Sequence, residues 1–195
     1  MSGAQRIRQV HADRVAPSAW RNGGGQTREL LTRPAAGEWQ LRISLADITR
    51  DGPFSAFPGV QRWFGVVAGA GVALRFGQEV QTVTADSPAF EFDGTAAPQC
   101  SLLGGPTRDL NLMLRNGRAD MSRVQADRAW DEPFGERGLF AIVAGTLRGH
   151  ASEAIVLPAA TLVWFLGPEP CRFEPASTGA AGWWLGWSAQ DGRRE

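Results

Sequence analysis

The stretch EWQLRISLADI, residues 38–48, carries the clearest structural signal in the sequence. Its apolar side chains recur at every second position: Trp39, Leu41, Ile43 and Leu45. A period of two is typical of a β-strand with one apolar face. The stretch RDLNLMLR, residues 108–115, alternates in the same way. These two segments predict a β-sheet.

Further short runs of β-branched and aromatic residues continue this pattern along the chain. We expect strands at residues 62–68, 72–76, 80–84, 139–144, 154–156, 161–166, 171–174 and 182–188. Turn signals rich in Gly, Pro and Asp separate them, and many short strands at this spacing indicate an all-β sandwich or barrel. Only residues 28–31 and 53–57 have weak helical character, so we expect little helix.

An internal repeat predicts two units of related design. Residues 64–69, FGVVAG, resemble residues 140–145, FAIVAG, and the strands at 108–115 and 182–188 follow at similar spacing. We therefore expect an N-terminal lobe over residues 1–128 and a C-terminal lobe over residues 129–195. The lobes would form one compact unit with shared strands, joined by the polar stretch 116–138.

The composition excludes several classes of function. The chain has 195 residues with 20 Arg, 20 acidic residues, no Lys, two His and two Cys. Without Lys it can form no Schiff base and no P-loop. Its zero net charge gives neither a basic face for nucleic acid nor a polybasic membrane signal. No secretory signal and no long apolar run are present, so we expect a cytoplasmic protein.

The segment WRNGGGQTREL, residues 20–30, is the most unusual in composition. Consecutive glycines allow positive φ angles, and their N–H groups can form a concavity that binds an anion. Asn22 and Thr27 flank the glycines with neutral donors and acceptors. A plain flexible turn explains the same residues, so both interpretations stay open.

Polar side chains alternate with the apolar ones on the two best-defined strands. Arg42 and Ser44 share one face of the first, and Asp109, Asn111 and Met113 share one face of the second. Such a face points either to solvent or into a cavity, and an exposed Met favours a cavity slightly.

Arg62 stands at the start of the most apolar strand of the first half. It is either a surface charge at the end of a strand or a clamp for a carboxylate. The two His and the two Cys belong to no known local signature of a nucleophile, so we interpret His11, His150, Cys100 and Cys171 as structural or solvated.

Four of these segments together resemble the HutD/Ves family: WRNGGGQTREL, WQLRISLADI, DGPFSAFPGVQRW and GPTRDLNLMLR occur in the family's order between Trp20 and Arg115. The sequence departs modestly at Ala19, Leu110 and Asn116, beside the motifs. The resemblance implies a bicupin, two β-barrel lobes of related design. HutD proteins are encoded with histidine-utilisation genes and are thought to bind N-formylglutamate or a related intermediate. Ves proteins are associated with stress responses.

The resemblance implies a binding site for a small acid. Many cupins hold a metal ion with three His and a Glu, but this chain has only two His, so we expect no metal and no cofactor. Arg62 and Arg42 are expected to bind carboxylate groups of the ligand. The other candidate ligand-binding residues are Trp20, Asn22, Gly23, Thr27, Ser44, Asp109, Asn111 and Met113. Asn22, Thr27, Ser44 and Asn111 would orient an amide or formyl group. Asp109 would pair with an Arg or accept an N–H, and Trp20 and Met113 would form the apolar wall.

Three functions are open at this point. The first is a non-catalytic regulator of histidine utilisation that binds a small carboxylate, with no catalytic residue. The second is a metal-independent isomerase or hydrolase with Asp109 as its base. The third is a protein-interaction module of a stress response. We expect no nucleic-acid or membrane partner, and analogy with other cupins favours a homodimer.

Overall fold

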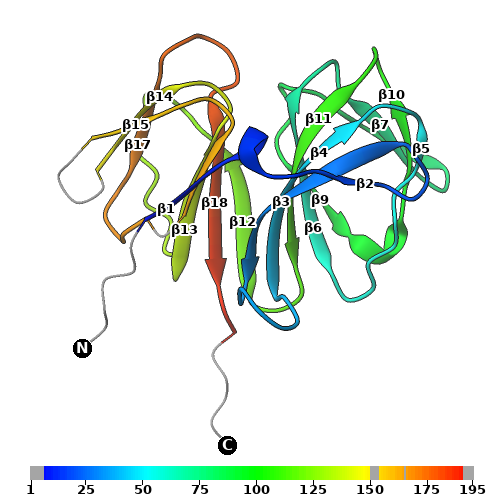
Figure 1. The fold of residues 1–195 in the computed structure, drawn as a ribbon, viewed down its shortest axis with the longest axis horizontal. Coiled ribbons are helices and arrows are strands. Elements are labelled where there is room, and N and C mark those ends of the chain that lie inside the picture. Colours follow the sequence, from blue (N-terminus) through cyan, green and yellow to red (C-terminus); the bar gives the residue numbers. More distant parts are fainter. Residues whose placement is uncertain (1–6, 150–153, 165, 191–195) are drawn as a thin grey trace, which may run out of the picture. The chain divides into compact units, whose positions relative to one another are not determined.

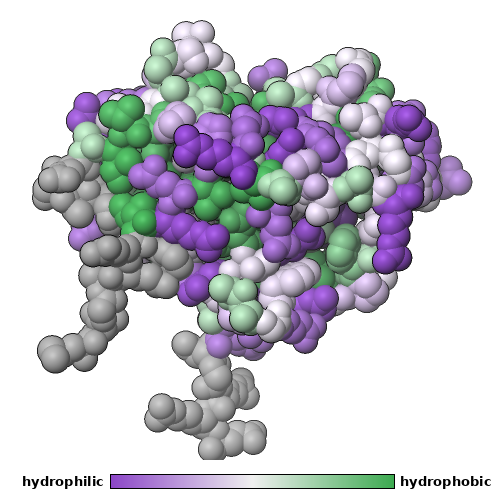
Figure 2. Space-filling model, viewed as in Figure 1, coloured by the Kyte–Doolittle hydropathy of each residue, from purple (hydrophilic) through white to green (hydrophobic). Residues whose placement is uncertain are grey.

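The computed structural model describes residues 7–149, 154–164 and 166–190, and these residues are almost entirely β-structure. Eighteen strands form four sheets, and two short 3-10 turns complete the regular structure of the described residues. No helix among them is long and apolar enough to cross a membrane. Hydrophilic residues cover much of the face drawn in Figure 2, with smaller hydrophobic groups between them.

The chain divides into two compact units (Figure 1). The N-terminal unit, Val15–Asn116, pairs a six-stranded sheet of order β2-β3-β4-β11-β6-β9 with a four-stranded sheet of order β5-β10-β7-β8. Its elements are β2 (Ser18–Ala19), β3 (Gly25–Arg33), β4 (Leu41–Ile48), β5 (Gly52–Pro53), β6 (Gln61–Ala68), β7 (Val72–Phe76), β8 (Glu79–Val83), β9 (Phe90–Asp93), η2 (Gly94–Ala96), β10 (Gln99–Leu102) and β11 (Thr107–Leu114).

The C-terminal unit contains the described residues from Gly117 onward together with the N-terminal segment up to Arg14. It pairs a five-stranded sheet of order β1-β16-β13-β18-β12 with a three-stranded sheet of order β15-β14-β17. Its elements are β1 (Arg8–His11), η1 (Ala12–Arg14), β12 (Arg118–Arg123), β13 (Glu136–Ala141), β14 (Gly145–Arg148), β15 (Ile155–Leu157), β16 (Thr161–Trp164), β17 (Arg172–Pro175) and β18 (Gly182–Ser188).

Each unit is an open sandwich whose sheets bury apolar residues between them. In the N-terminal unit, Ile48, Phe64 and Phe92 of the larger sheet pack in one cluster with Val72 and Leu74 of the smaller sheet. In the C-terminal unit, a second cluster joins the two sheets in the same way. These clusters confirm the all-β, cupin-like class that the alternating sequence predicts.

The two units repeat one strand order. The order β4-β11-β6-β9 of the first corresponds to β12-β18-β13-β16 of the second, and β10-β7-β8 corresponds to β17-β14-β15. The FGVVAG and FAIVAG segments therefore begin in corresponding strands, β6 and β13. Strand β1 adds a fifth strand to the larger C-terminal sheet through its pairing with β16.

The structure differs from the sequence-based expectations in three places. Residues 28–31, expected as a helix candidate, lie within β3, where a bulge between Glu29 and Leu31 breaks the alternation. Residues 53–57 are not helical, because Pro53 ends β5 and the rest is irregular. The expected boundary after residue 128 falls beyond β12, which pairs with β18 and so belongs to the C-terminal unit.

Candidate functional site

The predicted site residues of the central strands lie on one face of the six-stranded sheet. Residues directly opposite one another in paired strands point to the same side. The register places Met113 between Arg42 and Arg62, and the next row places Asn111 between Ser44 and Phe64. Asp109 follows in the third row, beside Ala46. The site is therefore built from β4, β11 and β6.

This face points into the sandwich, because Phe64, Val66 and Ile48 on the same side belong to the core between the two sheets. The polar members are correspondingly buried, with exposed fractions of 2% for Ser44, 1% for Asp109 and 6% for Asn111. A solvated outer face is therefore excluded for these side chains. The opposite face carries Leu41, Ile43 and Leu45, which are also fully buried.

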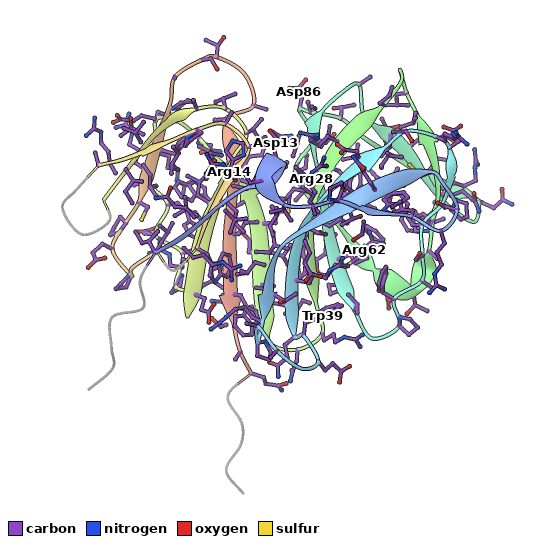
Figure 3. The ribbon with its side chains drawn as sticks, in the orientation of Figure 1. Asp13, Arg14, Arg28, Trp39, Arg62 and Asp86 are labelled. Atoms are coloured by element: carbon purple, nitrogen blue, oxygen red, sulfur yellow. The ribbon has the colours of Figure 1, made fainter. Side chains whose placement is uncertain are left out.

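Arg62 is the central cation of this site. Its side chain lies among the strands of the N-terminal unit in Figure 3 and is only 5% exposed. One nitrogen, Nη2, donates to Oδ1 of Asn111 at 2.8 Å, whereas Nε and Nη1 are buried without a hydrogen-bond partner. Burial lowers the pKa of Arg62 to about 10, so it is still a cation at neutral pH.

Three aromatic rings surround the Arg62 guanidinium. Its central carbon lies 4.9 Å from the ring centre of Phe92, 5.3 Å from that of Phe54 and 5.5 Å from that of Phe57. Contacts of this length attract a cation to the ring face and fix its orientation. The sequence did not identify this cage, because it depends on the pairing of Phe92 in β9 with Arg62 and on the path of the segment that carries Phe54 and Phe57.

Asp109 is the matching buried acid. One carboxylate oxygen accepts a hydrogen bond from Nδ2 of Asn111, and the other has no partner. Burial raises the pKa of Asp109 to about 8, although the charge of Arg62 and the bond from Asn111 act in the opposite direction. The carboxyl group therefore takes up or releases a proton near neutral pH.

Arg42 differs from Arg62 because its charge is already compensated. Its Nε donates to Oε2 of Glu29 at 2.9 Å, and its Nη1 lies 3.8 Å from the sulfur of Met113. The Arg42 side chain is 20% exposed and that of Glu29 is 52% exposed. Arg42 therefore lies at the more open end of the row, and a ligand anion would share it with Glu29.

The Gly-rich segment forms a tight turn that uses its own polar groups. Oδ1 of Asn22 accepts from the N–H of Gly24 at 3.0 Å, and Nδ2 of Asn22 lies 3.4 Å from the carbonyl oxygen of Pro53. Gly23 has a φ of +69°. A Cβ at Gly25 would lie 2.3 Å from the carbonyl oxygen of Asp47, so close pairing with β4 requires glycine there. The structure does not bring Asn22 and Gly23 into the buried row.

Trp20 and Thr27 lie at the border of the site. The indole Nε1 of Trp20 donates to Oγ1 of Thr27 at 2.7 Å. The Trp20 ring meets Phe54 edge to face, with ring centres 6.3 Å apart, and Phe54 in turn contacts Arg62. Thr27 pairs with Ala46 on the inner face. These two residues therefore support the wall of the site.

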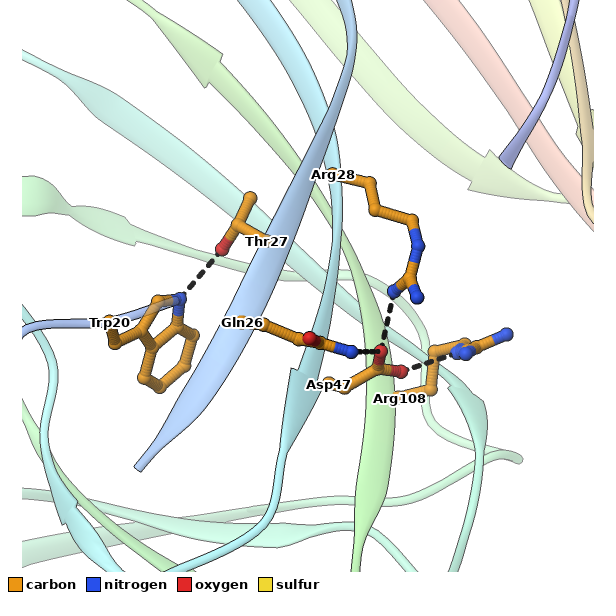
Figure 4. A network of polar contacts seen from close by, with 6 residues as sticks. All are labelled: Trp20, Gln26, Thr27, Arg28, Asp47 and Arg108. Atoms are coloured by element: carbon orange, nitrogen blue, oxygen red, sulfur yellow. Dashed lines mark hydrogen bonds and ion pairs between the residues drawn. The ribbon is translucent and has the colours of Figure 1, made fainter. Parts of the chain in front are cut away.

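A separate polar cluster lies on the other face of the same sheet (Figure 4). Asp47 accepts hydrogen bonds from Gln26 at 2.9 Å, Arg28 at 2.5 Å and Arg108 at 2.6 Å. Burial acts to raise the pKa of Asp47, but the bonds from Arg108, Gln26 and Arg28 outweigh it and lower this pKa to about 2. The cluster joins β3, β4 and β11, and sequence reasoning missed it because its members are dispersed along the chain.

No group of three His, Cys, Asp or Glu side chains that could hold a metal ion occurs among the described residues. His11 lies in β1 of the C-terminal unit, and His150 lies outside the described residues. Cys100 and Cys171 are buried free thiols whose pKa values are raised by burial. The chemistry of the N-terminal site therefore depends on a guanidinium, a carboxyl group, an amide and a hydroxyl.

The sequence comparisons agree on one family. A family model named HutD matches residues 12–181. The chain is 38% identical over 96 residues to an uncharacterised 21.2 kDa protein in the hutC 3′ region of Pseudomonas putida, a match that covers 48% of this chain and 50% of that protein. It is 36% identical over 121 residues to the protein Ves of Citrobacter koseri, covering 61% of this chain and 63% of that one. The chain thus spans about half to three fifths of these relatives.

Solved structures extend the likeness over nearly the whole chain. HutD from Pseudomonas fluorescens superimposes with a TM-score of 0.82 at 24% identity, covering 95% of this chain and 100% of that one. Oxalate decarboxylase from Bacillus subtilis superimposes with a TM-score of 0.61 at 8% identity, covering 97% and 79%. Both likenesses concern the fold, and they agree with a cupin-like architecture.

Proposed function

Because the chain belongs to the HutD family, we propose that it is a non-catalytic protein that binds a small carboxylic acid in its N-terminal unit. The family is linked to the histidine-utilisation region, and the proposed role is a regulator of that pathway. The proposed ligand is N-formylglutamate or a related intermediate.

The observation that carries this proposal is the state of Arg62. A buried guanidinium costs free energy when its donors have no partner, and a carboxylate is its strongest complement. Nε and Nη1 of Arg62 are buried without partners, and no acidic side chain among the described residues forms an ion pair with it. A ligand carboxylate at one of these nitrogens would supply the missing negative charge and an acceptor for that donor.

The neighbouring side chains suit the rest of such a ligand. Ser44 and Asn111, in the next row, supply the hydroxyl and amide that would orient a formyl or amide group. The partnerless oxygen of Asp109 would accept an N–H of the ligand. Arg42 would meet a second carboxylate at the open end of the row, in place of part of its contact with Glu29.

Calorimetry with N-formylglutamate, urocanate and glutamate tests the proposal. We expect at least one of them to bind, and Arg62→Gln to weaken its binding by about 100-fold, because a charge-assisted hydrogen bond is lost. Arg62→Lys keeps the charge but loses the planar fork, so it should also bind weakly. Arg75→Gln, an exposed arginine of β7, is the matched control and should bind normally.

Two results would count against the proposal. One is folded protein that binds none of the three acids at millimolar concentration. The other is Arg62→Gln protein that binds as tightly as the unchanged protein, since the acid would then occupy another part of the chain.

Asp109 supports a second candidate, a metal-independent isomerase or hydrolase. A buried carboxyl group with a pKa of about 8 can act as a general acid or base near neutral pH. Turnover of the same three acids, followed by NMR, tests this candidate. Turnover that disappears in Asp109→Asn, with binding retained, would favour the enzyme over the binding protein.

We also propose that the protein acts in the cytoplasm as a homodimer, by analogy with other cupins. Light scattering coupled to size-exclusion chromatography tests the dimer. A monomer at micromolar concentration would contradict it, and cell fractionation checks the compartment. A stable complex with another protein in that fraction would instead favour the interaction-module alternative.

A further inference from the structure

The C-terminal unit contains a groove of its own, of about 440 Å³. One wall is strand β12, at the edge of the five-stranded sheet, and the other is the segment 125–134. Arg118, Asp120 and Ser122 of β12 share one face, because they pair with Ser188, Gly186 and Trp184 of β18. This is the inward face, since Trp184 belongs to the core cluster of the unit. The groove thus occupies the border of the second sandwich.

The groove is not a copy of the site in the N-terminal unit. The arginine in the equivalent row is Arg137, which pairs with Gly186 as Arg62 pairs with Met113. Arg137 donates to the carbonyl oxygens of Gly167, Glu169 and Trp130 at 2.7–3.0 Å, so its hydrogen bonds stabilise the backbone of these segments. A ligand in this unit must therefore be held by different groups.

Aromatic rings close the interior beside the groove. Trp130 stacks on Trp184 with ring centres 5.1 Å apart, and Phe134 stacks on Trp130 at 6.4 Å. Phe134 also lies directly over Gly186, where an added Cβ would meet its ring at 2.2 Å. These rings form a rigid floor, and the charged groups of β12 stand at its edge.

Arg118 is held in place on this floor without an acidic partner. Its Nη2 donates to the carbonyl oxygen of Pro133 at 2.7 Å, and its guanidinium lies 4.2 Å from the ring centre of Phe134. Asp120 follows two residues later on the same face, at a spacing of about 7 Å along the strand. In the part of the chain that the structure describes, Asp120 forms no side-chain hydrogen bond or ion pair.

Both charge signs recur on the opposite wall. Arg128 brings a second guanidinium, and Asp131 and Glu132 bring further carboxylates. None of these three forms a side-chain hydrogen bond or ion pair within the described residues. The groove is therefore lined by positively and negatively charged side chains that do not form ion pairs with one another.

We propose that this groove binds a free α-amino acid through its charged head group. The carboxylate of the amino acid binds Arg118, with Arg128 on the opposite wall of the groove, and its ammonium binds Asp120. Such a head group carries both charges within a few atoms, and β12 brings a cation, Arg118, and an anion, Asp120, to one face two residues apart. A volume of about 440 Å³ lies within the ordinary range for small-molecule sites.

The test uses the full chain and L-phenylalanine as the probe, with calorimetry and the indole N–H signals of Trp130 and Trp184 as readouts. We expect L-phenylalanine to bind and to shift both signals, which are assigned from Trp→Phe variants. N-acetyl-L-phenylalanine lacks the ammonium and L-phenylalaninamide lacks the carboxylate, so each should bind about tenfold more weakly or not at all.

Variants locate the binding. Asp120→Asn keeps the size of the side chain and should weaken binding by about tenfold, and Arg128→Gln should weaken it by a smaller factor. Arg75→Gln, an exposed arginine of β7 in the N-terminal unit, is the matched control. Arg118→Gln also loses its contact with Pro133, so its fold is checked by near-UV circular dichroism.

The inference stands apart from the site at Arg62. Arg62→Gln should leave amino-acid binding unchanged, and Asp120→Asn should leave the binding of N-formylglutamate unchanged, so failure of one proposal does not imply failure of the other. Equal binding of L-phenylalanine and its two blocked derivatives would overturn the inference, and so would unchanged binding of L-phenylalanine by Asp120→Asn. Absence of L-phenylalanine binding at about 10 mM would also overturn it, since a specific site should have a dissociation constant below that concentration.

Discussion

Arg62 and Asp109 lie on one buried face and are connected through the amide of Asn111, without a direct ion pair. Arg62 donates to the amide oxygen and the amide nitrogen donates to Asp109. Each of the two charged groups keeps at least one buried atom without a partner. This arrangement leaves a cation and a titratable acid available inside the same sandwich.

Replacement of Arg62 by Met should abolish carboxylate binding and leave the free energy of unfolding nearly unchanged. An unpaired buried guanidinium contributes little to stability, and an apolar side chain of similar length would pack against Phe54, Phe57 and Phe92. We expect the free energy of unfolding to change by less than about 1 kcal/mol. Urea unfolding gives this value, and calorimetry should show that carboxylate binding is lost. A loss above about 3 kcal/mol would mean that Arg62 is part of the structural core.

Asp109 should make stability depend on pH. Its pKa is raised from 3.8 to about 8 in the folded chain, so the folded state binds the proton more tightly than the unfolded state. The contribution of this group to stability is complete below pH 4 and is lost as the pH rises through 8, with a slope of up to about 1.4 kcal/mol per pH unit.

Asp109→Asn removes this dependence and tests it. Urea unfolding of both proteins at pH 5, 6, 7 and 8 should show the variant gaining stability relative to the unchanged protein as the pH rises. Parallel curves for the two proteins would show that Asp109 is ionised in the folded chain at all four pH values.

Asp47 should contribute in the opposite pH direction. Hydrogen bonds from Arg108, Gln26 and Arg28 lower its pKa to about 2, so its contribution is present above pH 4 and is lost as the pH falls towards 2. Asp47→Asn should cost about 1–2 kcal/mol at pH 7, since the side chain is 17% exposed and solvent screens part of the interaction.

The exposed pair of Arg148 and Glu174 provides the control for Asp47. Glu174→Gln should change the free energy of unfolding by less than about 0.5 kcal/mol. Equal effects of the two substitutions at pH 7 would mean that the Asp47 cluster is no stronger than a surface ion pair.

Gly186→Ala should disturb the aromatic floor of the C-terminal unit. The added Cβ would lie 2.2 Å from a ring carbon of Phe134, so the ring must move away from Trp130. We expect a loss of about 1–3 kcal/mol and a change in near-UV circular dichroism. Gly135→Ala is the matched control, since its Cβ would meet nothing closer than 3.7 Å. If both variants unfold alike, the contact between Phe134 and Gly186 is not tight.

The alternation of side chains was sufficient to assign the faces of the central strands. Leu41, Ile43 and Leu45 lie on one side of β4 and Arg42 and Ser44 on the other, as the sequence predicts. The sequence also predicted the all-β class, the repeat of two units and the family. These features could be predicted because the period of two, the turn signals and the sequence motifs each depend on residues that are close together in the chain.

Contacts that join distant segments could not be predicted in this way. The pairing of Arg42 with Glu29 depends on the register of β3 at its bulge. The cage of Arg62 depends on the pairing of β6 with β9, which places Phe92 opposite Arg62, and on the path of the segment that carries Phe54 and Phe57. The same holds for β12, whose polar sequence was interpreted as a connection. It is a strand because β18 supplies its hydrogen-bond partners.

The sequence by itself determined which side chains share a face within each central strand, such as Asp109 and Asn111 in β11 and Arg42 and Ser44 in β4. Only the tertiary structure decided that Arg62 of β6 joins the side of Asp109 and Asn111, that this side is buried, and that Arg62 donates to one side chain whereas Arg137 donates to three backbone carbonyl oxygens. The physical reason is that the state of a charged group depends on every atom packed around it. Those atoms come from segments far apart in the chain, so their arrangement is fixed by sheet register and loop closure.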